Sequence, residues 1–292
     1  MNDKPKQVTL SDLRVKLDEI DDKIHQLLMD RTLLTDQVAI LKKDLPTKIR
    51  PGREAEILYR LTAQHKGNFP TDGLARIWRE IIGSTLRTEG PFSIAAFGTE
   101  TEHGFVEIAR DQYSSYTPLI KSGSTRAIVE SVRKGEASLG ILPLPQSDDQ
   151  DYWWRFLVSS NPETPKIIAR LPFISNGKPR ADGLEALVIA PVPQEKTGRD
   201  RSYLAIEADE EIGFKAIEGA LSQAGASVAF YQVYHNPDRP ADWTHLIETF
   251  GYIEDGGGQM GRFYDGLGKR ARRILHVGGY ATPLGFEDLQ HD

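Results

Sequence analysis

The sequence LSDLRVKLDEIDDKIHQLLMDRTLLTDQVAILKK at residues 10–43 has the repeat of one long amphipathic helix. Its apolar residues recur at alternating spacings of three and four, which places them in one stripe: Leu10, Leu13, Leu17, Ile20, Ile24, Leu27, Leu34, Val38 and Leu41. Arg31 stands in this series where another apolar residue is expected. A charge in a packed stripe is costly unless an anion neutralises it, so we expect Arg31 to meet an acidic side chain or an anionic ligand.

Two further cations of this segment differ in their position relative to Arg31. Lys42 follows it by eleven residues, so the two side chains lie within about 20° of one helix face and about 16 Å apart. Arg14 precedes Arg31 by 17 residues, or about 25 Å, so it cannot easily reach a small ligand held by Arg31. Another chain could supply an Arg14 side chain to that ligand. Alternatively, Arg14 and Lys42 only flank the stripe and extend into solvent, as long charged side chains commonly do.

The composition is typical of a soluble globular protein. The chain has 292 residues, 39% of them hydrophobic and 27% charged, which is enough for two or three domains. The absence of cysteine excludes disulfides, thiolate metal sites and cysteine nucleophiles, and the seven histidines show no metal-ligand spacing. A net charge of −6 argues against nucleic acid or an anionic membrane as partner. Since the sequence has neither a signal peptide nor a long apolar run, we expect a cytoplasmic protein.

The pattern changes at two places, which divide the chain into three predicted domains. At TEGPFSIAAFG (88–98), helical periodicity gives way to a Gly-Pro turn and a short apolar strand. The first domain, 1–90, is therefore all-helical, with helices predicted at 10–43, 52–65 and 72–88. The second change is the polar, turn-rich segment PVPQEKTGRDR (191–201).

The two domains after the helices combine strands and helices. Residues 91–198 have an α/β pattern, with strands predicted at FSIAAF, LGILPL, KIIARLPFI and EALVIAP and helices near 102–113, 124–134 and 149–158. Residues 199–292 have the order strand, helix, strand, strand, helix, strand, which is typical of a ferredoxin-like α+β fold. The predicted fold class is thus multidomain: all-α, then α/β, then ferredoxin-like.

The segment IRPGREAEILYRL (49–61) presents two charges at the start of the second predicted helix. Pro51 and Gly52 form a stiff turn, and Arg53 and Glu54 follow in the first helical turn. Together with DLRVKLDEIDDKIHQLLMDR, LKK and WREIIGSTLRTE, this segment resembles the all-helical chorismate mutases over residues 9–90. The resemblance implies a homodimer whose long first helices are exchanged, chorismate as substrate, prephenate as product, and neither cofactor nor metal.

The resemblance implies roles for the three cations of the first helix. Arg31 and Lys42 match the family's cations that bind a carboxylate and the ether oxygen of the substrate, and Arg14 matches an arginine from the partner subunit. These residue types suit the reaction. Chorismate is a dicarboxylate that rearranges in one pericyclic step, so the enzyme folds it and stabilises the negative charge growing on the ether oxygen. Arginine suits bidentate carboxylate binding, and lysine suits a point contact with the developing charge.

The remaining site residues that the resemblance implies lie in the second and third helices. Arg53 and Glu54 match an Arg-Glu pair whose glutamate receives the substrate hydroxyl. Thr85 stands where a serine is usual, and Glu89 where most bacterial members have glutamine. With Lys42 and Arg31, Glu89 completes the expected catalytic set. An aspartate that is common near Arg50 is missing from this chain.

The C-terminal 200 residues resemble a second enzyme family with several departures. VRKGEASLGILPLPQS (132–147) is similar to a prephenate dehydratase motif, and ALVIAPVPQEKTGRDRSYLAIE (186–207) to the junction between that domain and its ACT regulatory domain. However, Pro145 and Gln146 replace the Glu-Asn of the motif, the Thr-Arg-Phe motif is absent, and SNGKPRADGL (175–184) stands where the family has a second lobe. QVYH (232–235) replaces the phenylalanine-binding motif of the ACT-like region.

We therefore expect a chorismate mutase in aromatic amino-acid biosynthesis, with domains at 1–90, 91–198 (truncated dehydratase-like) and 199–292 (ACT-like). The C-terminal domains would serve regulation or assembly. Two alternatives remain open. One is a different reaction, either a bifunctional mutase and dehydratase or a lyase acting on isochorismate. The other is a binding protein that senses chorismate without converting it.

Overall fold

Three helices form the N-terminal part of the computed structural model, which describes residues 8–41, 48–99, 101, 103–147, 149, 151–174, 183–285 and 287–289. They are α1 (Leu10–Leu41), α2 (Pro51–Gln64) and α3 (Thr71–Thr88). All three predicted helices are confirmed, although the predicted end of the first, at residues 42 and 43, lies outside the described residues.

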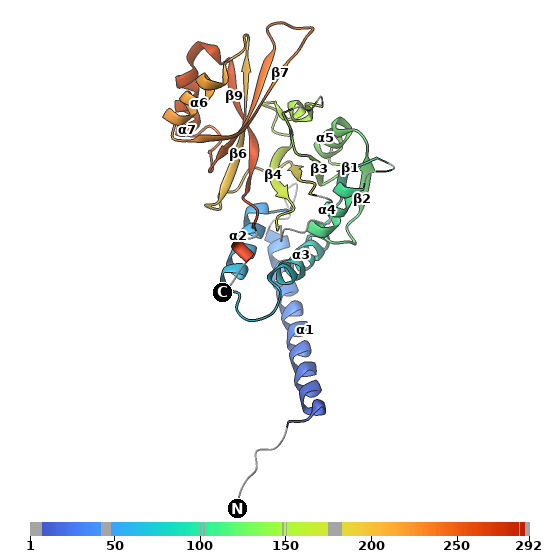
Figure 1. The fold of residues 1–292 in the computed structure, drawn as a ribbon. Helices are drawn as coiled ribbons and strands as arrows, with labels where there is room; N and C mark the ends of the chain where they lie inside the picture. Colours follow the sequence, from blue (N-terminus) through green and yellow to red (C-terminus); the bar gives the residue numbers. More distant parts are fainter. Residues whose placement is uncertain are drawn as a thin grey trace, which may run out of the picture.

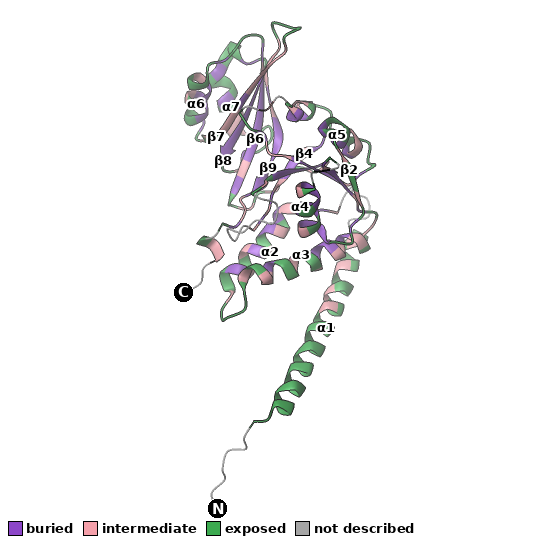
Figure 2. Ribbon diagram, turned by 45° about the vertical axis from the view of Figure 1, so that its right-hand side comes forward, coloured by how far each residue is buried: buried purple, intermediate pink, exposed green. Residues whose placement is uncertain are grey.

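Helix α1 projects away from the rest of the chain and is exposed along most of its length (Figures 1 and 2). Its apolar stripe is not covered: Leu17 is 59% exposed and Leu27 is 66% exposed. The stripe is therefore not packed within a single chain: α1 touches α3 through Leu28, Arg31 and Thr35, of which only Arg31 belongs to the stripe series. Neither α1 nor any other helix within the described residues is long and apolar enough to cross a membrane.

Helices α2 and α3 each bury one face. Pro51 begins α2, where its missing N–H costs no helical hydrogen bond. The buried residues recur every three or four positions: Gly52, Ala55, Leu58 and Thr62 in α2, and Ala75, Arg79, Ile82, Gly83 and Leu86 in α3. These faces share one hydrophobic core with the first part of the sheet region, which includes Phe92, Ile94 and Tyr113.

A nine-stranded sheet forms the rest of the fold, in the order β2-β1-β3-β5-β4-β9-β6-β8-β7. Its first half contains β1 (Ile94–Phe97), α4 (Gly104–Tyr113), β2 (Leu119–Ser122), α5 (Thr125–Arg133), β3 (Leu139–Pro143), the 3₁₀ helix η1 (Trp153–Leu157), β4 (Lys166–Leu171) and β5 (Ala186–Ala190). Strand β1 runs parallel to β2 and β3, whereas β5 is antiparallel to β3 and β4.

Two local features of this half differ from the sequence prediction. Strand β2 was not expected, because its four residues LIKS form a short edge strand whose middle residues are exposed. The helix expected near 149–158 is only the 3₁₀ helix η1, in which Trp153 and Trp154 are buried against the sheet. Tertiary packing of these two tryptophans, rather than helical propensity, holds this segment.

The second half of the sheet has the predicted ferredoxin-like pattern. Its elements are β6 (Asp200–Ala208), α6 (Phe214–Gln223), β7 (Ser227–His235), β8 (Trp243–Phe250), α7 (Gly258–Leu267), the 3₁₀ helix η2 (Gly268–Arg270) and β9 (Arg273–Ala281), followed by the 3₁₀ helix η3 (Glu287–Leu289). The strands pair antiparallel in the order β9-β6-β8-β7. Helices α6 and α7 lie together on one face of these strands, over a core of their own (Figure 1).

The two halves are joined edge to edge. Strand β9 pairs parallel with β4 through Ile167 and Gly278. Gly278 has a φ of +126°, and a Cβ atom there would lie 2.2 Å from the Ile167 carbonyl oxygen, so this close approach requires glycine. Backbone pairing therefore continues across the boundary predicted at 198 and 199.

Candidate active site

A pocket lies where the C-terminal part of α1 meets α2 and the end of α3. We call it the cationic pocket; it encloses an empty volume of about 530 Å³, part of it open to solvent. Its lining residues are Arg31, Thr35, Lys48, Arg50, Arg53, Glu54, Ile57, Ile82, Thr85, Leu86 and Glu89. Four cationic side chains and two carboxyl groups thus converge from three helices and the segment that precedes α2.

The cationic pocket brings together five of the seven residues singled out from the sequence. These are Arg31, Arg53, Glu54, Thr85 and Glu89. Lys42 lies outside the described residues. Arg14 lies in the exposed first half of α1 and is not among the described residues that line the pocket.

Arg31 is fixed to α3 by a short chain of hydrogen bonds. Its Nη1 donates to Thr85 Oγ1 at 3.0 Å, and Thr85 Oγ1 donates in turn to the Ile81 carbonyl at 2.7 Å. Burial lowers the pKa of Arg31, whereas the negative charge of Glu89 opposes this shift. Even so, Arg31 remains charged at neutral pH, as arginine side chains do in proteins. The acidic neighbour expected for Arg31 is therefore Glu89, with room left beside it for a ligand.

Glu89 closes the end of α3. Its backbone N–H donates to the Thr85 carbonyl at 3.1 Å, and its side-chain Oε2 is buried within the molecule. Because Glu89 lines the same pocket as Arg31 and Thr85, it is placed to approach a ligand held there.

The carboxyl group of Glu54 has a raised pKa. Burial raises its pKa to about 8; the charge of Arg79 opposes this shift, and those of Glu195 and Glu89 add to it. At neutral pH this carboxyl group is therefore mostly protonated and uncharged. The pocket then carries a net positive charge, which suits a ligand with two carboxylates.

Arg79 is a buried cation behind Glu54 that the sequence reasoning missed. It is only 9% exposed, and its guanidinium lies 5.8 Å from the centre of the Phe173 ring. Among the residues that the structure describes, its Nε and Nη2 lack hydrogen-bond partners, and burial lowers its pKa to about 10. The sequence pattern could have identified Arg79, because this residue lies between Ala75 and Ile82 in the buried face of α3. It interrupts an apolar series there, as Arg31 does in α1.

The motif positions of the C-terminal half contact one another. Gln232, in the segment that replaces the phenylalanine-binding motif, donates through Nε2 to the Gln146 carbonyl at 2.6 Å. Its Oε1 accepts from Trp154 Nε1 at 2.7 Å. Gln146 stands where the dehydratase motif has asparagine. These contacts tie the two halves of the sheet together through the side-chain amide of Gln232, which bonds to the backbone carbonyl of Gln146 and to the Trp154 side chain.

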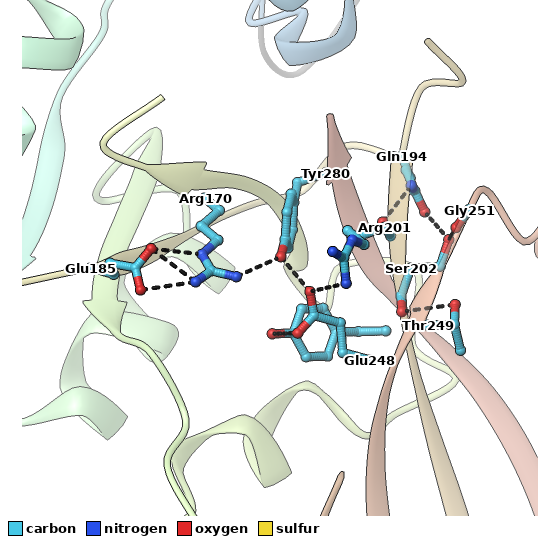
Figure 3. Close-up of polar contacts among 10 residues, drawn as sticks. Arg170, Glu185, Gln194, Arg201, Ser202, Glu248, Thr249, Gly251 and Tyr280 are labelled. Atoms are coloured by element: carbon cyan, nitrogen blue, oxygen red, sulfur yellow. Dashed lines mark hydrogen bonds and ion pairs between the residues drawn. The ribbon is translucent and has the colours of Figure 1, made fainter. Parts of the chain in front are cut away.

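A second polar network crosses the same junction (Figure 3). Arg170 of β4 is bidentate to Glu185 at 2.8 Å and donates to the Tyr280 hydroxyl at 3.1 Å. Tyr280 and Tyr203 both donate to the buried carboxylate of Glu248. The buried polar groups of this network hydrogen-bond to one another. We therefore interpret the network as a structural link between β4 and the ferredoxin-like strands. No group of three potential metal-ligating side chains occurs within the described part of the chain.

Comparison with known proteins gives a family match for the helical region. Residues 13–90 match the sequence model of the chorismate mutase type II family. The bifunctional chorismate mutase/prephenate dehydratase of Pseudomonas aeruginosa is 29% identical over 152 residues, which cover 49% of this chain and 40% of that protein. The protein of the same name from Aquifex aeolicus is 30% identical over 46% of this chain and 38% of its own length. The matched part thus spans about 40% of these curated relatives.

Solved structures resemble the sheet region. The prephenate dehydratase of Arthrobacter aurescens, solved in complex with L-Phe, aligns with a TM-score of 0.50 and 11% identity over 68% of this chain and 92% of that one. The prephenate dehydratase of Streptococcus mutans aligns with the same score and identity over 66% and 98%. At this identity the likeness concerns the fold alone. The expected succession of a helical mutase domain and a dehydratase-like mixed sheet is confirmed.

Proposed function

We propose that this chain, whose residues 13–90 form a chorismate mutase type II domain, converts chorismate to prephenate in aromatic amino-acid biosynthesis. The observation that carries the proposal is the cationic pocket, in which Arg31, Arg53, Glu54, Thr85 and Glu89 converge from separate helices. A dicarboxylate substrate would be neutralised there by fixed cations.

The reaction requires binding and orientation rather than a nucleophile. Arg31, held by Thr85, would bind one substrate carboxylate, and Arg53 would contribute further positive charge. Glu54 would hydrogen-bond the substrate hydroxyl. Holding the enolpyruvyl arm folded over the ring removes most of the entropy cost of the rearrangement, and donors near the ether oxygen stabilise its growing negative charge. Lys42 would be one of those donors, and Glu89 would be another when its carboxyl group is protonated.

A homodimer is part of this proposal. The apolar stripe of α1 is exposed in the single chain, and Arg14 stands on the same projecting part of the helix. Exposed apolar surface of this extent favours association. In the proposed dimer the two α1 helices cover each other's stripes, and each delivers Arg14 to the pocket of the other chain. We expect this dimer to be located in the cytoplasm.

For the C-terminal half we propose a role in regulation or assembly instead of dehydration. The side-chain amide of Gln232 donates to the backbone carbonyl of Gln146 and accepts a hydrogen bond from Trp154. The Gln232 side chain is therefore not free to bind a ligand, and Pro145 and Gln146 stand where the dehydratase motif has Glu-Asn.

One assay tests the proposal. The purified chain is incubated with chorismate and, in a separate reaction, with isochorismate, and substrate loss, prephenate and phenylpyruvate are followed by chromatography. Prephenate as the product supports the mutase. Binding of chorismate without turnover would favour a sensor, phenylpyruvate formed at an enzymatic rate would favour a bifunctional enzyme, and turnover of isochorismate but not chorismate would favour a lyase.

A further inference from the structure

The segment between β5 and β6 reaches back to the cationic pocket. Glu195, in this segment, accepts a hydrogen bond from the Gly52 backbone N–H at 3.0 Å and another from the Arg50 side chain. Arg50 lines the pocket, and Gly52 lies in the first turn of α2 beside Arg53 and Glu54. A carboxylate 143 residues away in the sequence thus satisfies one of the backbone donors that every helix leaves free at its start.

The contact is closely packed. A Cβ atom on Gly52 would lie 2.6 Å from the Glu195 Cβ and 3.3 Å from the Thr197 Cγ2, so the approach requires glycine at this position. The Glu195 side chain is 21% exposed, whereas that of Arg50 is 52% exposed. The half-buried carboxylate of Glu195 is therefore the more fixed partner, and Arg50 is the more exposed one.

A second contact holds the next turns of α2 against the same region. The Tyr59 hydroxyl donates to the Thr282 carbonyl just after β9, and the Arg199 guanidinium lies 4.8 Å from the centre of the Tyr59 ring. Arg199 is itself bidentate to Asp288, with distances of 2.9 and 3.1 Å. Figure 1 shows α2 lying beside the C-terminal end of the chain. The C-terminal half therefore holds α2 at two points, and the point nearer the pocket is Glu195.

We infer that Glu195 is a positioning residue of the mutase pocket, which fixes Arg50 and the first turn of α2 for binding of the substrate carboxylates. The inference rests on the mutase function proposed above. Arg50 supplies a cation to the pocket wall, and Glu195 accepts a hydrogen bond from that side chain. The C-terminal half thereby acts on the mutase reaction without contacting the substrate.

The sign of the effect on KM separates positioning from simple electrostatics. Glu195→Gln keeps the size of the side chain and removes its charge. If Glu195 only placed a negative charge near a dianionic substrate, the variant would bind chorismate more tightly and KM would fall. If Glu195 positions Arg50 and the helix start, KM rises by about threefold to tenfold while kcat changes by less than about twofold.

A double-mutant cycle tests whether the effect passes through Arg50. Arg50→Ala is expected to raise KM, and the Arg50→Ala, Glu195→Gln double variant to resemble Arg50→Ala alone, since two residues acting through one contact are not additive. Glu130→Gln is the matched control, because Glu130 also pairs with an arginine, Arg133, on the exposed side of α5, and neither residue lines the pocket. An unchanged or lower KM in Glu195→Gln, or fully additive effects, would overturn the inference.

Amide exchange gives a readout that does not need turnover. Peptides covering residues 49–57 should exchange faster in Glu195→Gln than in the parent chain, and at the parent rate in Glu130→Gln. Equal exchange in all three proteins would contradict the positioning role even if the parent is an active mutase. If the parent shows no turnover, the proposed function is wrong, and exchange alone decides whether Glu195 holds the start of α2.

Discussion

Arg31 owes its importance to being fixed before any ligand arrives. Its guanidinium is already bonded to Thr85, so little side-chain freedom is lost on binding a carboxylate. We expect Arg31→Ala to lower kcat/KM for chorismate by about 100-fold or more, the usual cost of removing one preorganised charged contact. Arg60→Ala, which removes an exposed arginine of α2, serves as the control. Near-parental turnover in a folded Arg31→Ala protein would remove Arg31 from the site.

Glu89 should give the mutase reaction a pH dependence. Glutamine at this position donates a hydrogen bond to the ether oxygen at any ordinary pH, whereas glutamate donates only when protonated and otherwise repels the developing charge. If Glu89 is that donor, turnover should be higher at acidic pH than at alkaline pH. Glu89→Gln should flatten the profile and raise activity at neutral and mildly alkaline pH. Coinciding pH profiles for the two folded proteins would show that Glu89 does not donate to the ether oxygen.

Glu54 should link folding stability to pH. Its pKa is about 8 in the folded chain because of burial, and near 4.5 when exposed. The folded state therefore holds this proton more tightly, and the stabilisation present below about pH 4.5 is lost as pH rises towards 8. Between pH 5 and 8, the free energy of unfolding of the parent should fall relative to Glu54→Gln by about 2 kcal/mol, allowing for partial solvent contact.

Urea unfolding of both proteins across this pH range measures the difference. Glu56→Gln, on the exposed side of the same helix, is the matched control and should follow the parent curve. A constant difference between the parent and Glu54→Gln across the range would mean that Glu54 is already ionised in the folded chain.

At the level of whole elements, α1 is the helix that a single chain leaves uncovered. If it crosses to a partner, Arg14 and Arg31 of one pocket come from different chains. Mixing Arg14→Ala and Arg31→Ala proteins should then restore activity, because a heterodimer holds one pocket with both arginines. Full random exchange gives half heterodimers with one intact pocket of two, so recovery should approach about one quarter of parental activity.

This prediction requires a control that shows that the two variant proteins exchange subunits. Native mass spectrometry of two chains of different mass, before and after mixing, reports the fraction of heterodimers. Demonstrated exchange without any recovery of activity would contradict a pocket shared between chains, and a monomeric parent chain would contradict the dimer.

At the scale of the whole molecule, the sheet region should lack dehydratase activity. Its two sheet halves are joined by β4 and β9, and Gln146 and Gln232 bond across that junction. We expect no phenylpyruvate from prephenate above the acid-catalysed background at neutral pH. A rate that scales with enzyme concentration would contradict this expectation and restore the bifunctional alternative.

Features that depend on nearby residues were predictable from the sequence. The apolar repeat at residues 10–41, Pro51 before α2 and the strand-helix order after residue 199 each reflect local geometry, and the structure has the corresponding elements. The candidate residues Arg53, Glu54, Thr85 and Glu89 were named through resemblance to known mutases, and they lie together because the helices carrying them are regular. Lys42 and Arg14 stay predictions.

Features that depend on distant residues needed the tertiary structure. The edge strand β2 carries only a weak pattern of its own, and the pairing of β4 with β9 joins segments about 110 residues apart. The burial that raises the pKa of Glu54 comes from packing around α2, and the contact of Glu195 with Arg50 joins residues 145 positions apart. Sequence periodicity reports which face of an element is apolar, but it does not report what covers that face. Only the folded chain decides which charges share one pocket.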